Sequence, residues 1–97
     1  MIERIWDVEV IGQAKKYHKN LSTKAKISFA SLLKELIELG PYRVKWSHYT
    51  KEVNANEKYH CHLNKGKPTY VVCWRIVDKH KRIIEVYYAG THENAPY

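Results

Sequence analysis

Thr69-Tyr70-Val71-Val72-Cys73-Trp74-Arg75-Ile76-Val77-Asp78 is apolar at both odd and even positions. Successive side chains of a strand point to opposite faces, so this pattern predicts a central strand at residues 69–78, buried on both faces. Residues 58–64 alternate between polar and apolar and predict a second strand, which a turn-forming sequence separates from residues 69–78. Another turn follows residues 69–78 and leads into a third strand at 82–90. Short turns join antiparallel strands, so these segments predict an antiparallel meander. Within it, Arg75 is expected to pair with Glu85 across two neighbouring strands.

Two helices are predicted before this meander. The first follows Gly12, where three residues fall at helical spacing: Ala14, Tyr17 and Leu21. The second starts after Ser22 or Thr23, either of which can cap it, and ends at Gly40-Pro41. One apolar stripe of the second helix is expected to face the core: Ala25, Phe29, Leu32, Leu33, Leu36 and Ile37.

The N-terminal segment and the stretch after the second helix complete the predicted fold. Residues 3–10 alternate between polar and apolar, as is typical of a half-buried strand. Residues 42–57 are harder to assign, and a short strand is predicted around Lys45–Tyr49. The order of elements predicts a single α+β domain over residues 1–97. In this fold an N-terminal strand is followed by two helices packed on one face of an antiparallel sheet of three to four strands.

The charge balance points to polyanionic partners. Seventeen Lys and Arg residues outnumber ten Asp and Glu residues, which gives a formal net charge of +7. Such an excess on a small domain attracts nucleic acid first and an acidic protein second, although it can also serve solubility alone. Charges from Glu3 onward interrupt the N-terminal segment, so neither a signal peptide nor a membrane span is predicted. The chain is expected to be cytoplasmic, with no membrane partner.

Cys61 and Cys73 are too few for a disulfide scaffold, and we expect reduced thiols that face each other across the hairpin. A zinc site built from His60, Cys61, His62 and His92 is disfavoured. Neighbouring residues of a strand point to opposite faces, so Cys61 cannot readily join both adjacent histidines as a ligand. No metal site is therefore predicted.

Histidines are the unusual feature of the composition. Five of the six follow Pro41: His48, His60, His62, His80 and His92. Histidine gains or loses a proton near neutral pH without special tuning, so a cluster of histidines indicates proton transfer. In Tyr59-His60-Cys61-His62-Leu63, strand alternation puts His60 and His62 on one face and the apolar residues on the other. The plain alternative is a pair of exposed histidines on a solvated face.

The turn after this segment carries Lys65 and Lys67. In an antiparallel meander the end of the last strand lies near the beginning of the central strand. His92 is therefore expected beside this turn and within reach of His62, unless the terminal segment frays. Such a surface would hold imidazoles next to cations that can neutralise a phosphate.

At this point the chain resembles a known family. Its order of elements is similar to that of the RelE/ParE-type toxins over nearly the whole length. Three stretches look most like the YafQ branch of that superfamily: Tyr59-His60-Cys61-His62-Leu63, Trp74-Arg75-Ile76-Val77-Asp78 and Ala89-Gly90-Thr91-His92-Glu93. The resemblance implies a RelE-like fold and the toxin of a type II toxin–antitoxin system. Such a toxin is an mRNA endoribonuclease, typically acts on ribosome-bound message, and is held inactive by a cognate antitoxin.

The resemblance also implies roles for individual residues. His48 looks like the histidine in the loop before the second strand of the family, His62 like the one that ends that strand, and His92 like the one after the last strand. Tyr97 matches an aromatic residue near the C-terminus and could stack on a base. The YafQ pattern has Asp-Trp where this chain has Asn64-Lys65-Gly66-Lys67, so the general base is left open between His62 and His48, with His92 as the acid.

Further residues are expected to assist this chemistry. His60 is a supporting candidate, and three lysines are expected to stabilise the phosphate: Lys45, Lys65 and Lys67. RNA carries its own nucleophile, the 2′-OH group, so the reaction needs neither a metal nor a small-molecule cofactor.

Two alternative functions fit the same fold. A ParE-like poison of DNA gyrase needs no cluster of imidazoles, so the histidines argue against it. A non-catalytic RNA-binding module would use the basic charge, and its activity would not depend on His92.

Overall fold

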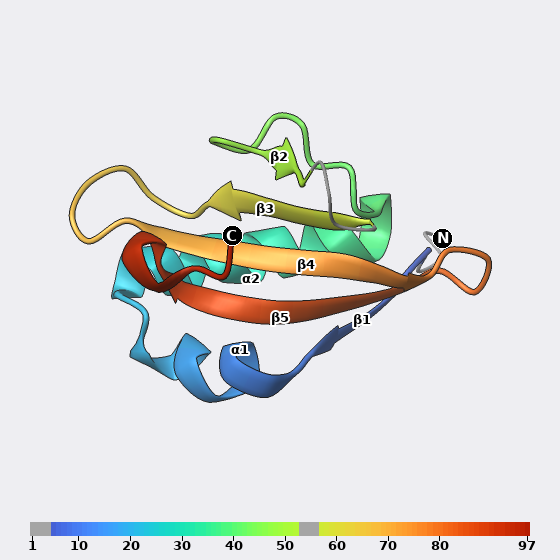
Figure 1. Cartoon of the computed structure of the whole chain (residues 1–97), viewed down its shortest axis with the longest axis horizontal. Coiled ribbons are helices and arrows are strands. Elements are labelled where there is room, and N and C mark those ends of the chain that lie inside the picture. Colours follow the sequence, from blue (N-terminus) through green and yellow to red (C-terminus); the bar gives the residue numbers. More distant parts are fainter. Residues whose placement is uncertain (1–4, 53–56) are drawn as a thin grey trace.

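Five strands form one mixed sheet in the order β1-β5-β4-β3-β2 (Figure 1). The computed structural model describes residues 5–52 and 57–97. The elements follow each other along the chain in this order: β1 (Asp7–Val10), α1 (Gly12–Tyr17), the 3₁₀ helix η1 (His18–Asn20), α2 (Thr23–Leu39), β2 (Thr50–Lys51), β3 (Lys58–His62), β4 (Tyr70–Asp78), β5 (Ile83–Thr91) and the 3₁₀ helix η2 (His92–Asn94).

The strand β4 is the centre of the sheet, as its sequence predicts. It pairs antiparallel with β3 on one side and with β5 on the other. Val71, Val72, Cys73 and Trp74 are fully buried, because β4 has packed side chains on both faces. The predicted α+β fold class and the meander are therefore confirmed, and so is the pair of Arg75 and Glu85, whose side chains lie 2.8 Å apart.

Three details of the predicted sheet were wrong. β1 pairs with β5 in parallel, so the sheet is mixed and has five strands rather than an antiparallel three or four. No short turn joins β1 to β5, so nothing in the sequence imposes an antiparallel pairing on them. The strand expected around Lys45–Tyr49 is a series of turns, and a two-residue strand follows at Thr50–Lys51. Of the predicted strand 3–10, residues 3 and 4 lie outside the described residues.

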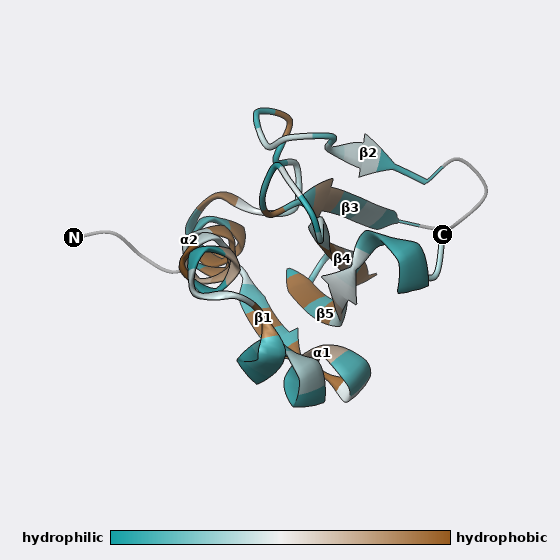
Figure 2. Ribbon diagram, turned by 90° about the vertical axis from the view of Figure 1, so that its left-hand side faces the viewer, coloured by the Kyte–Doolittle hydropathy of each residue, from teal (hydrophilic) through white to brown (hydrophobic). Residues whose placement is uncertain are grey.

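Both helices bury their apolar residues against the same face of the sheet (Figures 1 and 2). Ala14 of α1 and Leu32 and Leu36 of α2 belong to one cluster with Trp74 of β4 and Ile84 of β5. This cluster is the main hydrophobic core. The prediction of two helices on one face is therefore confirmed.

The two ends of α2 follow the signals in its sequence. The Ser22 side chain accepts a hydrogen bond from the Ala25 N–H at 3.2 Å, which satisfies one of the free donors at the helix start. Gly40 ends the helix with a φ of 94°, a left-handed conformation that favours glycine. A Cβ atom at Gly40 would lie 2.8 Å from Nε1 of Trp6, so the close approach of the indole requires glycine there as well.

The cysteines lie on opposite faces of the sheet, and the expectation that they face each other was wrong. The register pairs Cys61 with Val72 and Cys73 with His60, so Cys61 points to the helices and Cys73 to the other face. Both are free thiols, and burial raises the pKa of each to about 12.

Within the described part of the chain, no helix has the length and apolar character needed to cross a membrane.

Replacing Ser22 by alanine removes the oxygen that caps α2. We expect Ser22→Ala to lower the free energy of unfolding by about 1 kcal/mol, measured by urea denaturation. Ser31→Ala changes an exposed position of the same helix and is the matched control. It should be neutral or slightly stabilising, since alanine favours a helix interior more than serine does. Equal losses in both variants would contradict the role of the cap.

Candidate active site

The face of the sheet opposite the helices carries a small apolar cluster. Val71, Cys73 and Tyr88 are buried there, and Tyr87 and Ala95 pack against them. After β5 the chain passes through η2 and turns back over β4 (Figure 1). The segment after β5 therefore forms part of this face and brings its own polar side chains to it.

Three imidazoles from separate segments converge at one end of this face. The ring of His48, in the loop before β2, stacks on that of His62, the last residue of β3, with 4.0 Å between centroids. The ring of His92, the first residue of η2, meets His62 edge-on at 5.3 Å. His62 is thus the central member of a cluster of His48, His62 and His92, which we call the histidine cluster.

Backbone hydrogen bonds hold these segments together. The His62 N–H donates to the Ser47 carbonyl at 2.8 Å, which attaches the loop to the end of β3. The His92 N–H donates to the Thr69 carbonyl at 2.8 Å, which attaches η2 to the turn before β4. His48 has a φ of 55°, a conformation that non-glycine residues rarely adopt and that is common at functional sites. The cluster is therefore positioned by the backbone rather than by flexible side chains alone.

The surroundings of His62 lower the pKa of its ring and so favour the neutral form. Burial lowers its pKa most, and the nearby imidazoles of His48, His92 and His60 lower it further, since each would repel a second positive charge. A neutral imidazole has a free lone pair at neutral pH, which a general base requires.

His60 and Tyr97 form a stacked pair beside the cluster. Their rings lie 3.6 Å apart with an interplanar angle of 9°, and His60 is only 8% exposed. Nδ1 of His60 is 3.5 Å from Oε2 of Glu52, too far for a strong hydrogen bond, and it has no other acceptor among the described residues. Burial lowers the pKa of His60, partly offset by Glu52. His60 therefore points to the expected face but is covered by Tyr97, and one face of the Tyr97 ring is occupied.

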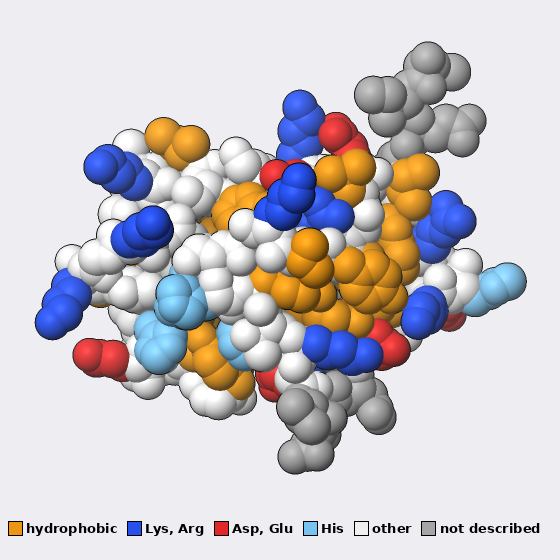
Figure 3. Space-filling model, turned by 90° about the horizontal axis from the view of Figure 1, so that it is seen from above, with side chains coloured by type: hydrophobic (Ala, Val, Ile, Leu, Met, Phe, Trp, Pro, Cys, Tyr) orange, Lys and Arg blue, Asp and Glu red, His pale blue; other side chains and the backbone are white. Residues whose placement is uncertain are grey.

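Two grooves meet at His62. The first has a volume of about 740 Å³ and is lined by Lys45, Lys65 and His62 among others. The second, of about 650 Å³, is lined by Lys67, His62 and His92. Figure 3 shows histidine side chains gathered on one face with basic side chains nearby. All three lysines singled out from the sequence thus lie along grooves that reach the histidine cluster.

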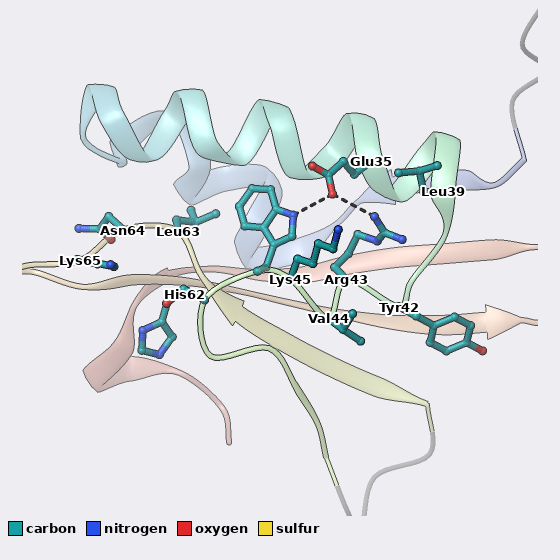
Figure 4. Close-up of a pocket in the computed structure, with 12 residues that line it drawn as sticks. Glu35, Leu39, Tyr42, Arg43, Val44, Lys45, His62, Leu63, Asn64 and Lys65 are labelled. Atoms are coloured by element: carbon teal, nitrogen blue, oxygen red, sulfur yellow. Dashed lines mark hydrogen bonds and ion pairs between the residues drawn. The ribbon is translucent and has the colours of Figure 1, made fainter.

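The first groove also contains residues that the sequence analysis missed. Oε1 of Glu35 accepts hydrogen bonds from Nη1 of Arg43 at 3.0 Å and from Nε1 of Trp46 at 2.9 Å (Figure 4). Glu35 lies beside the apolar stripe of α2, at a helix position where a polar residue is ordinary, so its place in the sequence gives no signal of its contacts. Nothing local in the sequence links it to Arg43 or Trp46.

Among the described residues, no three His, Cys, Asp or Glu side chains are arranged to hold a metal ion. Cys61, one member of the zinc set considered from the sequence, points to the helices instead.

Comparisons with known proteins identify the fold. No protein-family model matches the sequence, and no curated protein matches it. Solved structures do match. An archaeal RelE–RelB complex from Pyrococcus horikoshii contains a chain that superimposes with a TM-score of 0.70 at 16% identity, over 93% of this chain and 98% of that chain. The chain has the RelE fold.

Other structures with the RelE fold agree. A mutant of the E. coli toxin RelE in the free state gives a TM-score of 0.67 at 16% identity, over 93% of this chain and 86% of that chain. YoeB from Staphylococcus aureus, solved as a dimer, gives a TM-score of 0.66 at 19% identity, over 90% of this chain and 97% of that chain. The RelE-like fold expected from the order of elements is confirmed, whereas the YafQ branch stays a prediction.

Replacing His48 with glutamine removes one imidazole whose charge lowers the pKa of His62. It also uncovers one face of the His62 ring, so both effects raise the pKa of His62 toward the ordinary value of about 6.5. An NMR titration of the imidazole resonances measures the shift. His80→Gln, in the exposed turn at the opposite end of β4, is the control and should leave the His62 pKa unchanged. An unchanged pKa in His48→Gln would contradict the proposed coupling.

Replacing Tyr97 with alanine exposes the ring of His60, and the pKa of His60 should rise by NMR titration. The folded wild type binds fewer protons near pH 6 than the unfolded chain does, so its stability should fall as the pH drops below about 6.5. The contribution of His60 to this loss should be smaller in Tyr97→Ala. Tyr42→Ala, which removes a tyrosine that makes no ring contact with His60, should leave the His60 pKa in place.

Proposed function

We propose that the chain is a metal-independent endoribonuclease, the toxin of a type II toxin–antitoxin system. The observation that carries the proposal is the histidine cluster at the meeting point of two lysine-lined grooves. The ring of His62 lies 4.0 Å from that of His48 and 5.3 Å from that of His92. A ribose-phosphate laid across His62 would have an imidazole for each of the two proton transfers that RNA cleavage requires.

His62 is the general base in this proposal. It takes the proton of the ribose 2′-OH group, and the 2′-oxygen forms a bond to the adjacent phosphorus. The bond from phosphorus to the 5′-oxygen breaks, and His92, in its protonated form, donates a proton to that leaving oxygen. The products are a 2′,3′-cyclic phosphate and a free 5′-OH, and no oxidant, metal or cofactor enters the balance.

His48 serves His62 rather than the substrate in this scheme. Its ring stacks on His62 and its charge lowers the His62 pKa, which keeps the base neutral. The positive charges of Lys45, Lys65 and Lys67 offset the negative charge that builds up on the phosphate oxygens. His60 and Tyr97 stack on each other beside the histidine cluster. The exposed face of the Tyr97 ring can stack on a base of the RNA.

The partners follow from the same proposal. A RelE-fold protein has been solved in complex with RelB. We propose that this chain likewise binds a cognate antitoxin. Its target in this proposal is mRNA on the ribosome. The positions of His48, His62 and His92 favour the YafQ branch among the toxins of this fold.

Replacing either His62 or His92 with alanine should reduce RNA cleavage by about 10²- to 10⁴-fold, since each variant loses one positioned proton-transfer group. The assay uses purified protein with naked RNA and with programmed ribosomes, in the presence of EDTA. The ends of the products should be a 2′,3′-cyclic phosphate and a 5′-OH. His80→Ala removes an exposed histidine at the opposite end of β4 and should cleave like the wild type.

The alternatives give different results in the same experiment. Cleavage that persists in His62→Ala and His92→Ala would remove the imidazoles from the mechanism. DNA breaks that require gyrase, without RNA cleavage, would point to a gyrase poison. RNA binding without cleavage, unaffected by His92→Ala, would point to a binding module.

A further inference from the structure

The imidazole of His92, the general acid of the proposed reaction, lies between two other rings. It meets His62 edge-on at 5.3 Å and Tyr97 edge-on at 6.0 Å, with an interplanar angle of 85° for the second pair. The bond from its backbone N–H to Thr69 fixes the main chain but leaves the side chain free to rotate. His62 is fixed as the last residue of β3, so the orientation of the His92 ring depends on how firmly Tyr97 is held.

The ring of Tyr97 rests on His60. Tyr97 is 46% exposed, and the two rings stack with 3.6 Å between centroids and an interplanar angle of 9°. Two residues earlier, Ala95 packs against the small apolar cluster of this face, and its N–H donates to the His92 carbonyl at 3.3 Å. Ala95 therefore fixes the path of the backbone, whereas the flat side of His60 fixes the ring of Tyr97.

His60 has a polar atom that this stacking does not need. It is 8% exposed, and its Nδ1 atom has no hydrogen-bond partner among the described residues. A buried nitrogen without a partner costs free energy, and a phenylalanine would offer Tyr97 the same flat surface without that cost. The nitrogen of His60 therefore calls for an explanation of its own.

Glu52 supplies that explanation. Its N–H donates to the Lys58 carbonyl at 2.9 Å, which extends the pairing of β2 with β3 by one residue and puts Glu52 on the same face as His60. Its Oε2 atom lies 3.5 Å from Nδ1 of His60 and 3.5 Å from the hydroxyl of Tyr87, and the side chain is only 17% exposed. A carboxylate there favours the tautomer with the proton on Nδ1 and attracts that end of the ring. The charge of Glu52 thus determines how the ring of His60 is turned.

We propose that Glu52 and His60 are positioning residues for His92. The carboxylate orients the ring of His60, this ring supports Tyr97, and Tyr97 holds the His92 imidazole toward the leaving oxygen. The inference rests on the proposed function, in which His92 is the general acid. Neither Glu52 nor His60 contacts the cleaved phosphate in this scheme, and both act through the ring contacts alone.

Glu52→Gln keeps the shape of the side chain and removes its charge. It should lower kcat for RNA cleavage by about tenfold or more, because a misplaced proton donor slows the chemical step. KM should stay within about twofold of the wild-type value, since the lysines that bind phosphate are unchanged. Glu9→Gln makes the same change of charge on β1, at the opposite edge of the sheet, and should cleave like the wild type.

Two double variants show whether the effect passes through His60 and His92. His60→Phe keeps a flat ring under Tyr97 but has no nitrogen for the carboxylate, so it should lose about as much activity as Glu52→Gln. The Glu52→Gln/His60→Phe double variant should lose no more than either change alone, because the two residues act as one unit. In the His92→Ala background, Glu52→Gln should leave the residual rate unchanged. A residue with a merely structural role would lower that residual rate as well.

An NMR spectrum tests the same series of contacts without RNA. In the wild type, nuclear Overhauser effects should join ring protons of His92 to those of Tyr97, and Glu52→Gln should weaken them. The effects between His48 and His62, whose rings lie 4.0 Å apart, should persist in the variant and show that the site stays folded.

The positioning role is wrong if Glu52→Gln keeps the wild-type kcat, if it raises KM alone, or if it slows the His92→Ala variant by the same factor. Additive losses in the Glu52→Gln/His60→Phe double variant would also contradict it. If the wild type cleaves no RNA, the nuclease proposal fails, and the contacts between the rings of His92 and Tyr97 still decide whether Glu52 positions His92. If the wild type cleaves RNA but these contacts are the same in Glu52→Gln, the nuclease stands and the positioning role falls.

Discussion

The alternation of side chains along β3 governs the whole arrangement. Tyr59, Cys61 and Leu63 are buried against the helices, so His60 and His62 must point to the other face. A slip of one residue in the pairing of β3 with β4 would place both imidazoles in the core and the apolar side chains in solvent. The cost of burying two imidazoles without partners is several kcal/mol by the usual ~1–3 kcal/mol for each unsatisfied group, so the register is strongly fixed.

Electrostatic repulsion within the site follows from that register. Three imidazoles and several lysines are held on a small surface, where a proton on His62 is disfavoured. The fold accepts this repulsion because backbone hydrogen bonds, not the side chains, join the three segments. A bound polyanion would relieve the repulsion. The free protein is therefore electrostatically prepared for a phosphate and has little tendency to recruit a cation instead.

Features set by local sequence were predictable. The centre of the sheet at β4, a helix start at Ser22 or Thr23 and the end of α2 at Gly40 each follow from neighbouring residues, and the structure selects Ser22 as the cap. The approach of His92 to His62 also followed, because the topology of a meander requires it. The parallel pairing of β1 with β5 could not be predicted, since no short turn joins these two strands.

The details of the site depended on contacts between distant segments. The stacking of His60 on Tyr97 joins residues that are far apart in sequence and has no local signature. The same is true of the carboxylate of Glu35, whose partners lie in an irregular loop that no periodicity describes. The basic charge and the histidines could be counted from the sequence. The sequence could not tell which of the histidines would be covered by other side chains.

The attachment of η2 to the turn before β4 has a consequence for biosynthesis. His92 is translated after all five strands, and its N–H donates to the carbonyl of Thr69, a residue made well before it. At elongation rates of about 5–20 residues per second, seconds pass between the synthesis of His48 and that of His92. During that interval the growing polypeptide carries an incomplete set of imidazoles, so the histidine cluster can assemble only after residue 92 has been added.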